Sequence, residues 1–219
     1  MATKKVVLAY SGGLDTSYCL KYLKNEQGYE VHTVLINTDG FDDAELQAIE
    51  DRAYELGSAK HANLTILDKY YDKAIKYLIF GNVLKNNTYP LSVSAERVFQ
   101  AIEAIKYAKS IGATAIAHGS TGAGNDQIRF DLIFQTIAPE IEIITPIRDL
   151  KLSRQEEVDY LAKNGVHYSW EKAQYSINKG LWGTSIGGKE TLNAKLPLPN
   201  EAYPSQLTKE GEEKVTLEF

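Results

Sequence analysis

Two short glycine-rich segments carry the residues that could do chemistry in this sequence. Tyr10–Ser17 (YSGGLDTS) combines two glycines with three aliphatic hydroxyl groups and a carboxylate. His118–Phe130 (HGSTGAGNDQIRF) adds an amide, a carboxylate and a guanidinium group to three glycines. Glycines let a bulky anion approach the backbone closely, and free N–H groups at a helix start point at such an anion. The first segment therefore predicts a phosphate site. The second predicts an amino-acid site, because arginine can grip a carboxylate and aspartate an ammonium group.

Both segments lie between an expected strand and an expected helix. A strand at Lys4–Tyr10 precedes the first segment, and a helix at Thr16–Asn25 follows it. A strand at Thr114–His118 leads into the second segment, and a helix at Gln127–Thr136 follows. The carboxyl ends of parallel strands meet at one edge of a sheet, where ligands bind in open α/β folds. We therefore expect both segments to lie at the same edge.

The remaining pattern predicts a doubly wound α/β domain, with a parallel five-stranded sheet, over about residues 1–168. Residues 169–219 differ in character, because Trp170–Lys189 is rich in Tyr, Ser, Gly and Trp and prolines gather in Pro197–Pro204. We expect a linker there. Lys214–Phe219 alternates like the first strand of a second domain, which suggests a truncated chain. The other expected strands are Glu30–Asn37, His61–Leu67 and Glu142–Thr145, and the other expected helices are Asp42–Leu56, Tyr70–Leu84, Ser94–Ile111 and Ser153–Lys163.

The composition narrows the class of protein. Of 219 residues, 43% are hydrophobic and 24% charged, as in ordinary globular domains, and no apolar run approaches the roughly 18 residues of a membrane helix. A net charge of −5 argues against non-specific nucleic-acid binding. One cysteine and four scattered histidines form no disulfide framework and no zinc-ligand spacing. We expect a cytoplasmic protein without a membrane or nucleic-acid partner, and Cys19 as a small core residue.

The motifs also have simpler interpretations. The first segment is neither a G-x-x-x-x-G-K-[ST] loop nor a G-x-G-x-x-G loop, so a kinase-type ATPase or a dinucleotide enzyme is not indicated. Gly12 and Gly13 alone would fit a tight turn, and Asn125 and Asp126 suit a helix N-cap. Asp15 could organise the first loop or help to hold Mg²⁺, and no general base is evident.

The sequence S-G-G-L-D-T-S resembles the pyrophosphate loop of the N-type ATP pyrophosphatases, which have an adenine nucleotide alpha hydrolase-like fold. Together with H-G-x-T-G-x-G-N-D-Q-I-R-F it resembles argininosuccinate synthase. Further similar segments are Tyr89-Pro90-Leu91, Tyr175-Ser176 and Leu181–Ser185. The likeness runs from Lys5 to about Gly188, which corresponds to the front half of that family's longer members.

The resemblance implies a ligase of arginine biosynthesis. Such an enzyme condenses citrulline with aspartate to argininosuccinate, through a citrullyl-adenylate, and releases AMP and pyrophosphate. It implies ATP and Mg²⁺ as requirements and a homotetramer. The implied ATP-binding residues are Ala9, Tyr10, Ser11, Gly12, Gly13, Leu14, Asp15, Thr16, Ser17, Ile36 and Gly119; those for aspartate are Thr121, Asn125 and Asp126; those for citrulline are Tyr89, Ser94, Asn125, Arg129, Ser176 and Ser185.

The sequence also departs from the family pattern. Ala123 stands where the family usually has a lysine, and Ile36–Phe41 replaces a small-residue and Gly-Gln pattern. Ser92-Val93 replaces a Gly-Thr pair, and Ala95-Glu96-Arg97 stands for Ala-Arg-Pro. Because these changes surround the citrulline side, we hypothesise that the acceptor is an N-acylated citrulline. Two alternatives are another ATP-pyrophosphatase ligase, for which a thiolating type would need more cysteines, and a nucleotide-binding module without catalysis.

Overall fold

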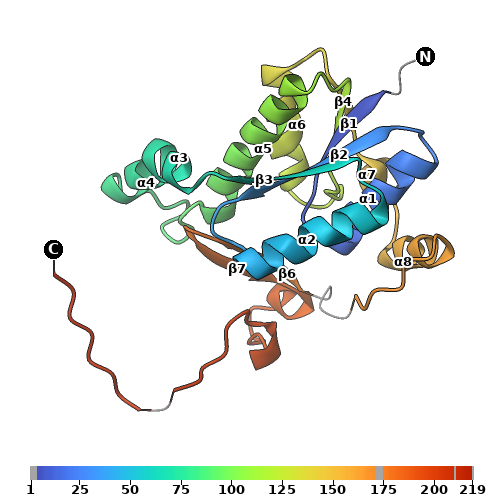
Figure 1. The fold of residues 1–219 in the computed structure, drawn as a ribbon. Coiled ribbons are helices and arrows are strands. Elements are labelled where there is room, and N and C mark those ends of the chain that lie inside the picture. The colour runs from blue at the N-terminus through green and yellow to red at the C-terminus, as the bar shows by residue number, and fades with distance from the viewer. Residues whose placement is uncertain (1–3, 171–174, 210, 219) are drawn as a thin grey trace.

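The computed structural model describes residues 4–170, 175–209 and 211–218. A five-stranded parallel sheet with strand order β3-β2-β1-β4-β5 forms its centre (Figure 1). This confirms the α/β fold expected from the sequence. The order reverses direction at β1, so β1 and β4 are neighbours that are distant in sequence, which is where such sheets bind ligands. The strands are β1 (Lys5–Ala9), β2 (Glu30–Asn37), β3 (Lys60–Thr65), β4 (Ala115–Ala117) and β5 (Glu142–Ile144).

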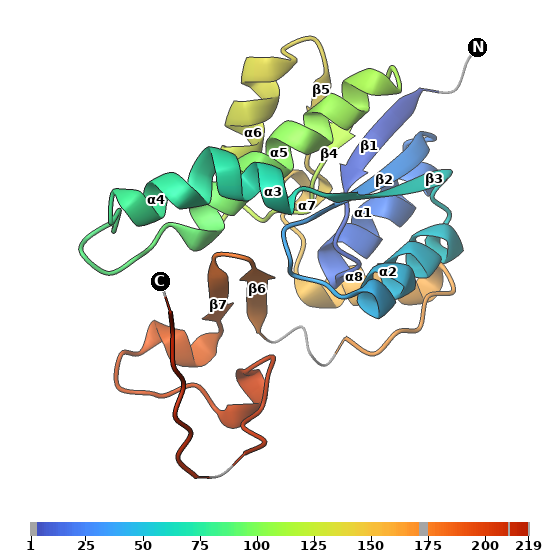
Figure 2. The same ribbon diagram turned by 60° about the vertical axis from the view of Figure 1, so that its left-hand side comes forward.

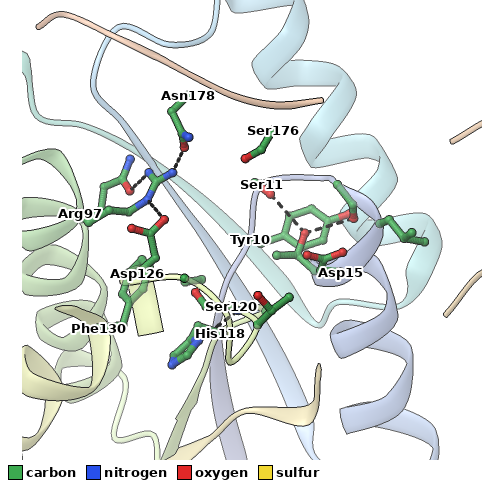
Figure 3. A pocket seen from close by; sticks show the side chains of 18 of the residues that line it. Tyr10, Ser11, Asp15, Arg97, His118, Ser120, Asp126, Phe130, Ser176 and Asn178 are labelled. Carbon is green, nitrogen blue, oxygen red and sulfur yellow. Dashed lines mark hydrogen bonds and ion pairs between the residues drawn. The ribbon is translucent and has the colours of Figure 1, made fainter. Parts of the chain in front are cut away.

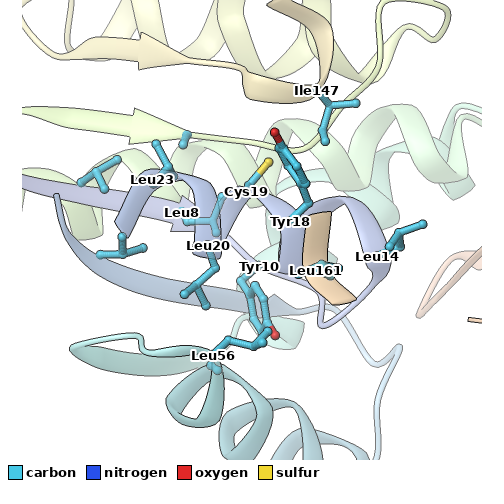
Figure 4. Close-up of a cluster of buried hydrophobic side chains, with 14 of the residues drawn as sticks. Leu8, Tyr10, Leu14, Tyr18, Cys19, Leu20, Leu23, Leu56, Ile147 and Leu161 are labelled. Carbon is cyan, nitrogen blue, oxygen red and sulfur yellow. The ribbon is translucent and has the colours of Figure 1, made fainter. Parts of the chain in front are cut away.

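Helices cover both faces of the sheet, and each face has its own apolar core. Successive side chains of a strand point to opposite faces. Val6 and Leu8 of β1 accordingly pack in one cluster and Val7 in the other. Figure 4 shows the first cluster, where Cys19 is completely buried, as expected. The helices on this face are α1 (Leu14–Asn25), α2 (Asp43–Leu56), α7 (Pro146–Leu150) and α8 (Arg154–Lys163), and those on the other are α5 (Ser92–Ser110) and α6 (Asp126–Ile137).

Local capping explains where two of these helices begin. Asp42 accepts a hydrogen bond from Glu45 N at 2.8 Å, and Glu45 bonds back to the backbone N–H of Asp42. Ser153 and Glu156 form the same reciprocal pair at the start of α8. Such capping boxes satisfy N–H groups that have no partner within the helix. The Ser153–Glu156 spacing predicted this start correctly.

Several boundaries differ from the expected ones. The helix expected at Tyr70–Leu84 begins earlier, as α3 (Leu67–Tyr70), and continues through a π-helical turn into α4 (Lys76–Phe80). This helical segment extends away from the sheet (Figures 1 and 2). α7 was not expected, because a helix of one turn leaves no periodic pattern.

The segment expected to be a linker contains an antiparallel hairpin of β6 (Ser176–Gly180) and β7 (Gly183–Gly187). Figure 2 shows it beyond the carboxyl ends of the parallel strands. The strand expected at Lys214–Phe219 is wrong for its described residues, since 211–218 form neither strand nor helix; Phe219 lies outside the described residues. An alternating segment makes a strand only where another strand pairs with it. Across the described ranges, no helix combines the length and apolar character needed to cross a membrane.

Candidate nucleotide and amino-acid site

A cavity of about 800 Å³ lies at the carboxyl edge of the sheet (Figure 3). The loops after β1 and β4 lie on it, as the parallel arrangement predicted. The end of β2, the N-terminal part of α5, the start of α8 and strand β6 also contribute to its lining. Fourteen of the sequence-predicted residues line this cavity: Ala9, Tyr10, Ser11, Gly13, Leu14, Asp15, Thr16, Ile36, Gly119, Thr121, Asn125, Asp126, Arg129 and Ser176.

The loop after β1 presents the start of helix α1 to the cavity. Gly13 is the N-cap residue, and its helix has no side-chain cap, so the first N–H groups are open to a ligand. Gly12 has φ +73°, a left-handed conformation that favours glycine. Its carbonyl oxygen accepts a hydrogen bond from Arg52 Nη1 at 2.6 Å, which fixes the turn from α2. The hydroxyl groups of Ser11 and Thr16 lie 3.4 Å apart beside it.

Gly12 and Ser17 are absent from the cavity lining. Ser17 is completely buried, and its hydroxyl oxygen has no hydrogen-bond partner among the described residues. The side chain of Tyr10 is nearly buried too, and this burial raises its pKa to about 12. The expected hydroxyl donors are therefore Ser11 and Thr16. Ser17 supplies packing only, because its backbone N–H already donates to Gly13 O at 2.9 Å.

Two carboxyl groups meet at the base of this loop. Asp15 lines the cavity from α1, and Glu157 from α8 contacts it. Glu157 is only 2% exposed, and its Oε2 finds no donor among the described residues. Burial first, and then the charge of Asp15, raise the pKa of Glu157 to about 8. At neutral pH Glu157 therefore keeps its proton.

Hydrogen bonds of the His118 side chain hold the loop after β4 in place. His118 Nε2 lies 2.9 Å from Asp131 Oδ1, and its Nδ1 accepts a hydrogen bond from Ser120 N at 3.2 Å. These bonds require the tautomer with hydrogen on Nε2. Phe130 stacks on the imidazole ring with centroids 5.3 Å apart. His118 thus packs and bonds locally and orients the loop.

Asp126, at the start of α6, lies between two arginines. Figure 3 shows its contact with the first of them, Arg97. Its Oδ2 accepts from Arg97 Nε at 3.0 Å, and its Oδ1 accepts from Arg129 Nη1 at 2.5 Å. Arg129 also donates to Ser94 Oγ at 2.9 Å. The N-cap residue of α6, Asn125, makes no side-chain cap bond, so its amide remains a cavity group.

Tyr89 and Ser94 lie behind Arg129 rather than in the cavity lining. The Tyr89 hydroxyl accepts from Ser94 N at 3.1 Å and lies 3.3 Å from Ser94 Oγ. Burial opposes ionisation of Tyr89, but the hydrogen bonds from Ser94 outweigh it and lower its pKa. These two expected citrulline residues therefore join the site through Arg129.

The hairpin closes one side of the cavity. Leu181 N donates to Thr38 O at 2.7 Å, and Trp182 Nε1 donates to Pro90 O at 2.7 Å. At Gly40 a Cβ atom would lie 2.3 Å from the carbonyl oxygen of Lys179, so this approach requires glycine. Ser176 and Ser185, expected in a loop, lie on strands instead. Ser176 faces the cavity, whereas Ser185 pairs with Asn178 and is absent from the lining.

The sequence placed Glu96 and Arg97 on the citrulline side only as departures from the family pattern and gave them no role. Gln100 and Asn178 were not identified at all. Glu96 is buried, and it accepts hydrogen bonds from Thr38 Oγ1 at 2.7 Å and Gln100 Nε2 at 2.9 Å. Burial raises its pKa. Arg97 lies one helical turn after Ser94, a spacing that could have identified it. Asn178 lay in the presumed linker, so no signal pointed to it.

Oxygen ligands for a hard cation are present beside the first loop. Asp15 and the hydroxyl of Thr16 lie in the lining, and carboxylate and hydroxyl oxygens suit Mg²⁺, which usually keeps several waters. No group of three or more His, Cys, Asp or Glu side chains forms a metal cluster among the residues described.

Comparison with known proteins agrees with this arrangement. The model of the Arginosuccinate synthase N-terminal HUP domain matches residues 5–167. The argininosuccinate synthase of Methanocaldococcus jannaschii is 40% identical over 216 residues, which cover 97% of this chain and 54% of that protein. That of Sulfolobus acidocaldarius is 38% identical, with 98% and 55% covered, and that of Pyrococcus furiosus is 39% identical, with 91% and 48% covered. The chain spans about half the length of these curated relatives. The chain belongs to the argininosuccinate synthase family, and its residues 5–167 correspond to the N-terminal HUP domain of that family.

Proposed function

We propose that this chain is the nucleotide-binding part of a ligase that uses ATP to condense citrulline, or an N-acylated citrulline, with aspartate. The observation that carries the proposal is the convergence of the two strand-end loops on one cavity. One loop offers open N–H groups suited to phosphates, and the other offers Asp126 between two guanidinium groups, suited to amino acids. Family membership supports the same reaction.

The chemistry explains why both ligands must share one cavity. The ureido carbon of citrulline is a poor electrophile, because two nitrogens feed electrons to it. Its oxygen attacks the α-phosphorus of ATP, which forms a citrullyl-adenylate and releases pyrophosphate. The aspartate amine then attacks the activated carbon and displaces AMP. Positioning of these reactants can supply much of the rate enhancement.

The first loop would bind the phosphates. The N–H groups at the start of α1 and the hydroxyls of Ser11 and Thr16 stabilise charge that develops on the departing pyrophosphate. Bound Mg²⁺ would neutralise phosphate charge, with Asp15 as the nearest carboxylate of the loop. Ile36, at the end of β2, and Gly119 would meet the nucleotide through their backbones.

The second loop would bind the amino acids. Thr121, Asn125 and Asp126 are proposed to bind aspartate, while Arg129, with Ser94 and Tyr89 behind it, is proposed to bind citrulline. Ser176 lines the cavity from the hairpin and is proposed to contact citrulline there. Ser185 does not line the cavity, so it could contact citrulline only if the hairpin moved. The departures around Glu96 and Arg97 line the cavity, which supports the proposal of a modified citrulline. We also propose a cytoplasmic homo-oligomer, by analogy with the family.

One assay tests the function. Pyrophosphate release from ATP is measured with citrulline and aspartate added separately and together, and with N-acetylcitrulline in place of citrulline. Dependence on both amino acids is the expected result. Dependence on neither, despite ATP binding, would identify a nucleotide-binding module, and dependence on another acceptor would identify a different ATP-pyrophosphatase ligase. N-acetylcitrulline turnover no faster than that of citrulline would remove support for the acylated acceptor.

A further inference from the structure

Asp126 and the two arginines form a charge pattern that is the inverse of aspartic acid. The site holds one carboxylate between two guanidinium groups, at 3.0 Å from Arg97 and 2.5 Å from Arg129. Free aspartate carries one ammonium group between two carboxylates. An ammonium group can replace the arginines at Asp126, and the released guanidinium groups can then bind carboxylates. The preformed ion pairs thus keep each group paired until a ligand of inverse charge arrives.

The two arginines have separate surroundings. Arg129 donates to Ser94 Oγ, which lies beside the Tyr89 hydroxyl. Arg97 is directed toward the hairpin instead: its Nη2 donates to Asn178 Oδ1, and its Nη1 donates to Gln100 Oε1 at 2.6 Å. Figure 3 shows Arg97 reaching from α5 between Asp126 and Asn178. Each guanidinium group therefore has its own side of Asp126.

Arg97 is also preorganised. Its side chain is 17% exposed and lies in the cavity lining, so it is largely desolvated yet reachable. Three of its five N–H groups donate hydrogen bonds to described residues, and all three acceptors lie in or next to the cavity. Its Nε and Nη2 atoms, bonded to Asp126 and Asn178, form one edge of the guanidinium plane. A carboxylate can bind two such donors together.

We propose that Arg97 binds a carboxylate of the aspartate substrate, while Asp126 binds its ammonium group and Arg129 remains with the citrulline carboxylate. This inference rests on the proposed function, because it names aspartate as the ligand. Asn178 then acts as a positioning residue, which holds Arg97 from β6. The two arginines thereby separate two amino-acid substrates that carry the same α-amino and α-carboxylate groups.

The test measures binding of aspartate, asparagine and succinate to the full chain with ATP present, by isothermal titration calorimetry. Arg97→Gln should weaken aspartate binding about tenfold or more, because a charged hydrogen-bonded pair is lost. Arg97→Lys should recover part of that loss. Lys106→Gln, an exposed ion-paired position on the same helix, is the control and should bind aspartate normally. In steady state, Arg97→Gln should raise KM for aspartate more than KM for the citrulline substrate.

The outcomes separate this inference from the proposed function. Unchanged aspartate binding in Arg97→Gln, or an equal rise in both KM values, would overturn the inference alone. If Arg97→Gln does not fold, the same comparison is made with Asn178→Ala, which should weaken aspartate binding without changing ATP affinity. Wild-type chain that binds ATP and succinate, but no aspartate, would refute the proposed function. In that case, loss of succinate binding in Arg97→Gln would still support a carboxylate site at Arg97. Succinate binding that is retained in Arg97→Gln would refute a carboxylate site there.

Discussion

The buried carboxyl group of Glu157, next to the half-buried Asp15, makes the stability of the fold dependent on pH. Burial and the neighbouring Asp15 raise the pKa of Glu157 from 4.5 to about 8. Between these values the folded chain keeps a proton that the unfolded chain releases. The free energy of unfolding therefore falls as pH rises through this window. Glu157→Gln should remove the effect, because glutamine resembles the protonated acid and cannot ionise.

The size of the effect follows from the shift. Each pH unit within the window changes the free energy of unfolding by about 1.4 kcal/mol for one proton. Between pH 5 and pH 8 the wild-type chain should therefore lose on the order of 3 kcal/mol relative to Glu157→Gln. This is an upper limit, because the pair borders a cavity that water can enter. The variant and the wild type should be similar at pH 5 and most different near pH 8.

Urea denaturation at several pH values between 5 and 9 measures this difference. The control is Glu212→Gln, which neutralises an exposed glutamate in the C-terminal segment and should leave the pH dependence of the wild type intact. Parallel stability curves for wild type and Glu157→Gln over the whole range would refute the reasoning. So would a variant that is less stable than the wild type at pH 8.

Two further substitutions test the glycine loop and the hairpin. Gly12→Ala and Gly28→Ala both place a Cβ at positive φ, +73° and +68°, which costs about 1 kcal/mol of stability each. Only Gly12→Ala also brings that Cβ to 3.0 Å from a core isoleucine, Ile49. Gly12→Ala alone should therefore weaken ATP binding, and it should lower the free energy of unfolding more than Gly28→Ala does. Equal losses for the two variants, in urea denaturation and in ATP titration, would contradict this. Trp182→Phe removes the bond to Pro90 O, and about 1 kcal/mol of stability should be lost. Hydrogen exchange at Leu181 N–H should quicken, and an unchanged exchange rate would show that the hairpin is held by other contacts.

Much of the fold could be predicted because local sequence carries the relevant physics. The buried runs at β1 and β2 identify strands covered on both faces, and the spacing from Ser153 to Glu156 identifies the start of α8. Glycines beside hydroxyl and charged residues at two strand ends identified the loops. Parallel strands place those ends at one edge, and fourteen of the site residues that the family resemblance implied line one cavity there.

By itself, then, the sequence determined the five parallel strands, the starts of α2 and α8 and the two loops, since periodicity and turn chemistry act over a few neighbouring residues. Only the tertiary structure brought Asn178 to Arg97, 81 residues away, and Glu157 to Asp15. The presumed linker is a hairpin whose two strands pair with each other, and Thr38 and Pro90, far away in the chain, attach it to the domain by accepting hydrogen bonds from its N–H groups. Such contacts depend on which surfaces meet after the sheet has formed, and no local pattern encodes them.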